Sequence, residues 1–139
     1  MISLEKNMYL LPNRFFLRDN DKLFVSFNLS SVPQDMVITA MQINIPTQLT
    51  AAAALQIFKI LDGWDVGAMA VGHVPPVELM KTTDIPEQTR EFQVEVLQFA
   101  IPWRLDSFNN HGICILVPHL LVPALFSESA PPSLVITTV

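Results

Sequence analysis

Few side chains in this sequence could support catalysis or zinc binding: three histidines, His73, His111 and His119, and one cysteine, Cys114. Imidazole and thiolate are the usual zinc ligands, and only His111, Cys114 and His119 are close in sequence. Residues three apart on a strand point to opposite faces, so His111 and Cys114 could share a metal ion only if His111 lies in a turn before the strand. No HExxH, CxxC, P-loop or nucleophile-elbow pattern is present. We therefore predict neither a metal centre nor an enzyme.

Two acidic turns are candidates for a calcium site, because calcium binds carboxylate and carbonyl oxygens. They are Arg18-Asp19-Asn20-Asp21 and Asp62-Gly63-Trp64-Asp65. Neither turn has the spacing of an EF-hand, and Asp and Asn side chains favour turns without any metal. The sequence predicts no cofactor, with structural calcium as the alternative to ordinary turn chemistry.

Sugar recognition would need exposed aromatic rings beside polar side chains. The candidates are Tyr9, Trp64 and Trp103, and they are few because the chain has only two tryptophans and one tyrosine. Trp64 follows a glycine and stands between two aspartates. It is either displayed at the surface or plugs one end of the fold.

Cys114 is the only cysteine, so it cannot form a disulfide within the chain. In the alternating run GICILV it is predicted to be a small buried hydrophobic residue. The alternative is a surface thiol that links two subunits.

The composition indicates one apolar, acidic domain. The 139 residues suffice for a single domain, residues 1–139, with a sizeable core. Half of them are hydrophobic and only 15% are charged, which favours partner surfaces, oligomerisation or membrane contact. The apolar runs are too short for a transmembrane segment, and the first residues predict no Sec signal peptide. A net charge of −5 argues against nucleic acid as a partner.

Alternation of apolar and polar residues predicts a series of short strands. The expected strands are residues 23–29, 37–45, 55–60, 91–96, 113–117 and 134–139, with a further one at 120–126. Residues 97–105 suit a helical turn as well as a strand, provided that Pro102 lies near an end. Eleven prolines separate the short strands. This pattern predicts an all-β fold, an antiparallel β-sandwich that is jelly-roll-like.

Several segments together resemble a known family. They are KLFVSFNLSSVP, VITAMQINIP, LQIFKILDGWD, the stretch from FQVEV through Trp103 to NNHGICILV, and PPSLVITTV. The chain resembles the DNRLRE-type β-sandwich domains, which are similar to carbohydrate-binding modules and occur mainly in secreted or surface-associated prokaryotic proteins. The resemblance implies a β-sandwich at the cell surface or outside the cell and a polysaccharide ligand. Without a recognisable signal, a cytoplasmic location stays open.

The chain departs from that family at its start, which is shorter and apolar at Met8, Tyr9, Leu10 and Leu11. An extended segment can pair with an open sheet edge of a neighbour. We therefore expect residues 1–12 to act as an edge-pairing or subunit-linking segment. The leading hypothesis is a non-catalytic structural subunit that self-assembles through sheet edges and apolar faces into a homo-oligomer or filament, such as a surface fibre or coat. The alternative is a carbohydrate-binding module that recognises a polysaccharide.

Overall fold

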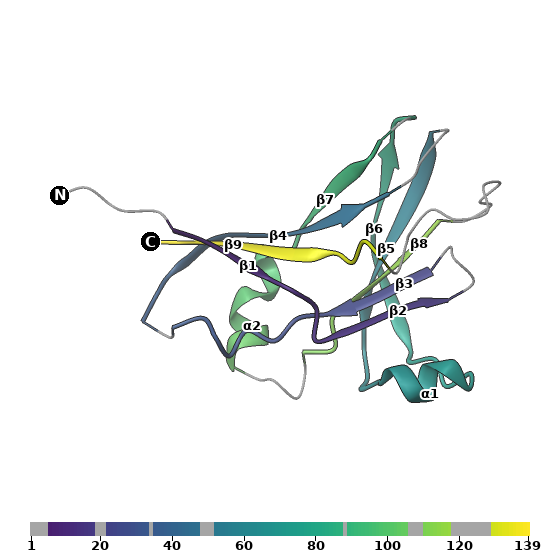
Figure 1. Ribbon diagram of the computed structural model, residues 1–139, viewed down its shortest axis with the longest axis horizontal. Helices are drawn as coiled ribbons and strands as arrows, with labels where there is room; N and C mark the ends of the chain where they lie inside the picture. The colour runs from purple at the N-terminus through teal and green to yellow at the C-terminus, as the bar shows by residue number, and fades with distance from the viewer. Residues whose placement is uncertain are drawn as a thin grey trace.

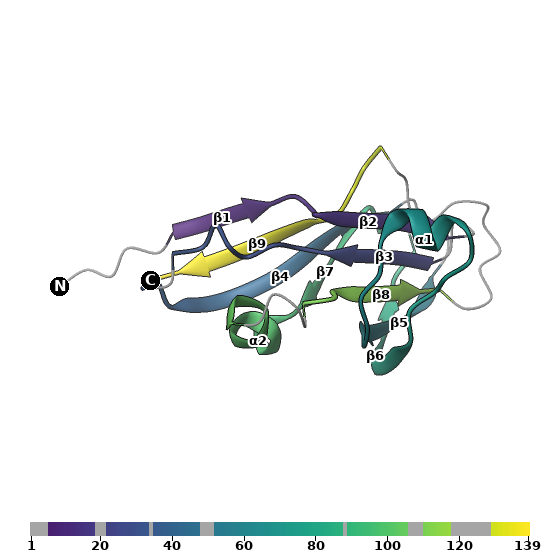
Figure 2. The same cartoon turned by 90° about the horizontal axis from the view of Figure 1, so that it is seen from below.

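Two antiparallel sheets pack face to face in the computed structural model of this chain (Figures 1 and 2). The structure describes residues 6–18, 22–33, 35–47, 52–87, 89–105, 110–117 and 129–139. Sheet A has the order β1 (Lys6–Leu10), β9 (Ser133–Thr138), β4 (Ile38–Pro46) and β7 (Glu91–Glu95). Sheet B has the order β2 (Arg14–Arg18), β3 (Lys22–Ser26), β8 (Ile113–Leu116), β5 (Ala53–Ile60) and β6 (Val77–Ile85). The helices are α1 (Val66–Ala70), the 3₁₀ turn η1 (Leu97–Phe99) and α2 (Ala100–Leu105).

The strand pairs are nested along the chain. β5 pairs with β6, and around that hairpin β4 pairs with β7, β3 with β8 and β1 with β9. A chain folded on itself in this way and rolled into two layers is a jelly roll, to which β2 adds a fifth strand at the edge of sheet B. The predicted all-β, jelly-roll-like sandwich is confirmed.

Six of the expected strands are present with ends shifted by a few residues, as β3, β4, β5, β7, β8 and β9. Residues 97–105 form η1 and α2 rather than a strand, and Pro102 lies in the first turn of α2, where a missing N–H costs no hydrogen bond. The sequence did not predict β2 or β6 as strands. The strand expected at residues 120–126 lies outside the described residues.

The main core lies between the sheets and is built from alternate residues of each strand. In β3, Leu23 and Val25 face inward, and in β4, Met41, Ile43 and Ile45 do the same. η1 and α2 supply aromatic rings to this core. Arg104 of α2 donates two hydrogen bonds, to the carbonyl oxygens of Met36 (2.9 Å) and Pro33 (2.6 Å), which anchor the helix to the β3–β4 connection.

A second, smaller core covers the outer face of sheet B. The strand registers align one outward-facing residue from every strand of this sheet into a row that runs Phe16, Phe24, Cys114, Phe58 and Leu79. Residues 61–76, which include α1, fold over part of this row (Figures 1 and 2). Phe24 interrupts the polar alternation of its strand for this reason: both faces of β3 are covered.

Candidate functional site

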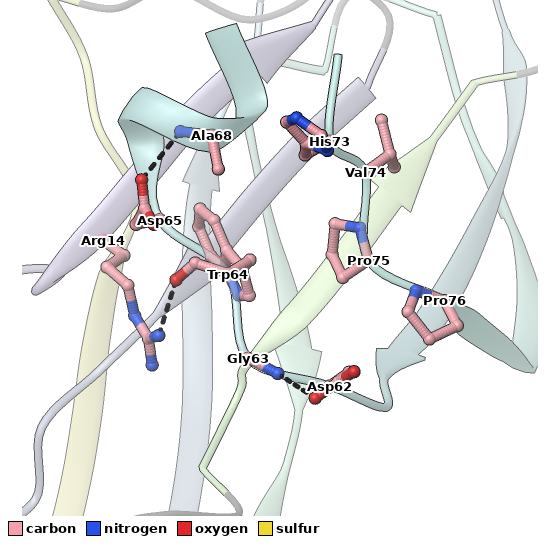
Figure 3. Close-up of a pocket in the computed structure, with 10 residues that line it drawn as sticks. All are labelled: Arg14, Asp62, Gly63, Trp64, Asp65, Ala68, His73, Val74, Pro75 and Pro76. Atoms are coloured by element: carbon pink, nitrogen blue, oxygen red, sulfur yellow. Dashed lines mark hydrogen bonds between the residues drawn. The ribbon is translucent and has the colours of Figure 1, made fainter. Parts of the chain in front are cut away.

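The candidate site is a surface pocket of about 490 Å³ beside α1 (Figure 3). It lies between β2 and the connection from β5 to β6, which carries most of its lining. The lining residues are Arg14, Asp62, Gly63, Trp64, Asp65, Ala68, His73, Val74, Pro75 and Pro76. Two carboxylates, one imidazole and one guanidinium therefore border the same hollow.

Trp64 forms the base of this region, and its ring is buried. Only 6% of the residue is exposed. The ring packs against the tilted ring of Phe24, with centroids 6.0 Å apart, and Met69 belongs to the same buried cluster. The indole N–H donates to the carbonyl oxygen of His111 at 2.7 Å. Burying the ring while pairing its one polar group is the usual role of a tryptophan in a core. Trp64 thus plugs the second core, and its ring faces are closed to a sugar.

Arg14 ties this loop to the sheet. From β2 its Nε donates to Ser26 Oγ (2.9 Å), its Nη1 to the carbonyl oxygen of Trp64 (2.9 Å) and its Nη2 to that of Asn110 (3.0 Å). The guanidinium also lies 5.3 Å from the centre of the Trp64 ring, a cation–π distance. Partial burial lowers the pKa of Arg14, while the nearby charge of Asp65 acts in the opposite direction. Arg14 is therefore a structural clamp, and sequence patterns gave no sign of it.

The two aspartates of the pocket are used by the backbone. Asp62 accepts from the N–H of Gly63 (2.8 Å), and Asp65 caps α1 by accepting from the N–H of Ala68 (2.7 Å). His73 is exposed on the opposite rim (Figure 3). Across the described residues no group of three His, Cys, Asp or Glu side chains could hold a metal ion. Structural calcium at Asp62 and Asp65 stays a prediction, and Asp19, Asn20 and Asp21 lie outside the described residues.

Cys114 lies beneath Trp64 in the second core and is buried. Burial raises the pKa of its thiol to about 12, an effect that the charge of Lys22 partly opposes. A buried, protonated thiol is a poor nucleophile. In this conformation Cys114 is not accessible for an intermolecular disulfide. His111 lies just before β8, as a shared metal site would require, whereas His119 is outside the described residues.

The other two aromatic candidates differ sharply in exposure. Trp103 of α2 is 4% exposed and stacks on Phe99, with ring centroids 5.0 Å apart, inside the main core. Tyr9 of β1 is 69% exposed. The structure therefore separates Trp64, Trp103 and Tyr9 into three environments and offers only the Tyr9 ring for stacking.

The predicted assembly residues form the edge strand β1 and its end. Met8 and Leu10 point inward and pack on the main core, whereas Tyr9 and Leu11, the latter 76% exposed, point outward. β1 pairs along its whole length with β9, from Lys6 opposite Thr138 to Leu10 opposite Leu134. No described strand pairs with its other edge.

Two groups of side chains lie near sheet edges that no described strand covers. The outer face of sheet A beside Tyr9 is mainly polar, and it includes Asn7, Gln42, Asn44, Gln93 and Thr137. Across the molecule, exposed apolar side chains lie on β6, on α1 and in the loops on either side of α1: Leu61, Val66, Val71, Val74, Val77 and Leu79. The sequence analysis missed Val77 and Leu79 of this group because β6 was not recognised as a strand.

No protein-family model matches the chain, and no curated protein matches it in sequence. The resemblance to DNRLRE-type domains and the surface location that it implies therefore stay predictions. Among the described residues, neither helix approaches the length needed to cross a membrane.

Proposed function

We propose that this chain is a non-catalytic structural subunit that associates with further copies of itself through sheet edges and exposed apolar side chains. The guanidinium and the two carboxylates of the pocket support this choice because they are already used internally. Arg14 holds the loop, while Asp62 and Asp65 satisfy backbone N–H groups. Such groups are not arranged as a nucleophile with its base, or as an acid with a base.

The observation that carries the proposal is the set of sheet edges. β1 and β7 bound sheet A, β2 and β6 bound sheet B, and no described strand covers the outer edge of any of them. Edges of soluble proteins are normally short, covered or charged, because an open edge is a template for another chain. Here β6 has nine residues and carries Glu78, Lys81 and Asp84, but exposed Val77 and Leu79 at its start lie beside the exposed apolar residues of α1.

The test is self-association in a concentration series of the purified chain, followed by light scattering and by electron microscopy. Association through edges predicts scattering that rises with concentration and regular filaments, rings or tubes. A chain that stays monomeric at every concentration up to the solubility limit refutes the proposal. Thermal unfolding of the same samples controls for aggregation of unfolded chain, because regular assembly raises the melting temperature with concentration.

One observation favours a second candidate, the recognition of a polysaccharide. Tyr9 presents its ring on the mainly polar outer face of sheet A, with Asn7 two residues before it on the same face of β1, and an aromatic ring beside an amide suits a pyranose ring. Binding in a glycan panel that Tyr9→Ala abolishes, with unchanged thermal stability, would support this candidate. Binding that survives Tyr9→Ala, or a panel without any binding, would remove the proposed sugar site.

A further inference from the structure

We infer that association runs head to tail, with β1 of one copy pairing antiparallel with β7 of the next, so that sheet A continues from molecule to molecule. This inference rests on the proposed function and names the contact. Its partner is a second copy of this chain. Three observations carry it: the direction of the edge strands, the match of their inward residues, and their opposite charge.

Strand direction follows from the number of strands in each sheet. Sheet A has four strands among the described residues, each antiparallel to its neighbour, so β1 and β7 run in opposite directions. A copy displaced sideways without rotation therefore brings its β7 antiparallel to β1. Sheet B has five strands, so β2 and β6 run in the same direction and would meet in parallel. Only sheet A can continue antiparallel in a head-to-tail arrangement, and antiparallel pairs are slightly more stable per residue.

The two strands also match residue by residue. Each has five residues, and inward side chains must lie opposite inward side chains for the core to continue. This condition is met when Met8 faces Val94 and Leu10 faces Phe92 of the next copy. In that register Tyr9 lies opposite Gln93 and Asn7 opposite Glu95 on the outer face. The half-buried Met8 and Leu10 then gain cover from the neighbour.

Charge favours this arrangement over a twofold contact of β7 with β7. On one side of the sandwich, β1 and β2 carry three basic side chains and no acidic one: Lys6, Arg14 and Arg18. On the other side, β6 and β7 carry four acidic side chains and one basic one: Glu78, Asp84, Glu91, Glu95 and Lys81. Pairing β7 with another β7 would gather four glutamates on one face, and like charges on facing strands destabilise a sheet. Pairing β1 with β7 instead places Glu95 opposite Asn7 and Glu91 opposite Leu11, so no two acidic side chains face each other, and the basic edge of one copy attracts the acidic edge of the next during their encounter.

The test uses single cysteines on exposed, outward-facing positions in a Cys114→Ala background. One chain carries Tyr9→Cys and another, distinguished by a size tag, carries Gln93→Cys. Directly opposed residues of an antiparallel pair have Cα atoms about 4.5–5.5 Å apart, within the range of a disulfide. After mild oxidation at a concentration where light scattering rises, the mixture should give a mixed dimer in large excess over either self-dimer. Asn7→Cys with Glu95→Cys is the second pair, and Tyr9→Cys with Thr82→Cys of β6 is the matched control.

The outcomes separate the contact from the proposed function. A mixed dimer for both tested pairs, and none for the control, supports the inference. Chains that assemble without either mixed dimer refute the β1–β7 contact and leave the proposed function standing. Self-dimers in yields equal to that of the mixed dimer would refute the head-to-tail contact and indicate a twofold contact. The last outcome is that the cysteine variants and their Cys114→Ala parent all fold, as circular dichroism and thermal melting report, but stay monomeric at every concentration. This outcome refutes both the β1–β7 contact and the proposed function.

Discussion

Among the four glycines, Gly112 is the one at which an added methyl group should damage this fold most. It immediately precedes β8 with a φ of +85°, a left-handed conformation that costs any other residue about 1–2 kcal/mol. A Cβ atom at Gly112 would lie 2.0 Å from the carbonyl oxygen of Val25 and 2.7 Å from the Cα atom of Ser26. Both atoms belong to the backbone of β3 in the interior of sheet B, so no side chain can rotate away.

The distance from this Cβ atom to the Val25 carbonyl oxygen must therefore grow from 2.0 Å to at least 3.0 Å, and this change moves β8 and β3 apart. Overpacking of this kind costs about 1–3 kcal/mol. Ser26 also carries the hydrogen bonds to Arg14 and Asn13, which the same shift would stretch. We expect Gly112→Ala to lower the free energy of unfolding by about 3–5 kcal/mol, a large share of the stability of an ordinary domain.

Gly72→Ala is the matched control. Gly72 has a similar φ of +94°, but no described atom lies within 4 Å of the Cβ position, so only the conformational cost of about 1–2 kcal/mol applies. The measurement is equilibrium unfolding in urea, followed by the fluorescence of Trp64 and Trp103. If Gly112→Ala costs no more than Gly72→Ala, the close approach of β8 to β3 is refuted.

Two further predictions concern the second core. Because burial raises the pKa of Cys114 from 9.0 to about 12, the folded chain keeps a thiol proton that the unfolded chain loses. The free energy of unfolding should therefore fall between pH 9 and 12 by at most about 1.4 kcal/mol per pH unit, relative to the Cys114→Ala variant measured alongside. If the free energies of unfolding of the two proteins change with pH in parallel, this prediction is wrong. Arg14→Lys keeps the charge but loses the three-way hydrogen bonding, and should lower the free energy of unfolding in urea by about 1–3 kcal/mol. A loss below about 0.5 kcal/mol, the scatter of neutral surface substitutions, would show that Arg14 is no clamp.

The sequence predicted the fold class because most strands have one solvated face. In β7, exposed Glu91, Gln93 and Glu95 alternate with buried Phe92 and Val94, so its period is plain. β2 was missed because adjacent Phe15 and Phe16 contact different cores on the two faces of sheet B. Alternation of polarity disappears where both faces of a strand are covered.

β6 was missed for another reason. The register with β5 shifts between Ile57 and Phe58, leaving Met80 as an extra residue on β6. Such a bulge breaks the period of two within the strand. The sequence singled out the turn from Asp62 to Asp65 in the candidate site, but the clamp was beyond sequence reasoning because it joins Arg14 to Trp64, fifty positions apart, and no local pattern links them.

The nested pairing of strands also sets the order in which the protein can be completed during synthesis. Sheet B needs nothing beyond β8, which ends at Leu116, whereas sheet A needs β9, the last described strand, between β1 and β4. A nascent chain can therefore form its five-stranded layer while a slot the width of one strand stays empty in the other. Closing this slot joins Lys6 to Thr138, 132 residues away, and such distant pairings are slow to form. Until it closes, β9 of a second copy carries the same pairing residues as the chain's own β9 and can occupy the slot, which is the route to a strand-exchanged dimer.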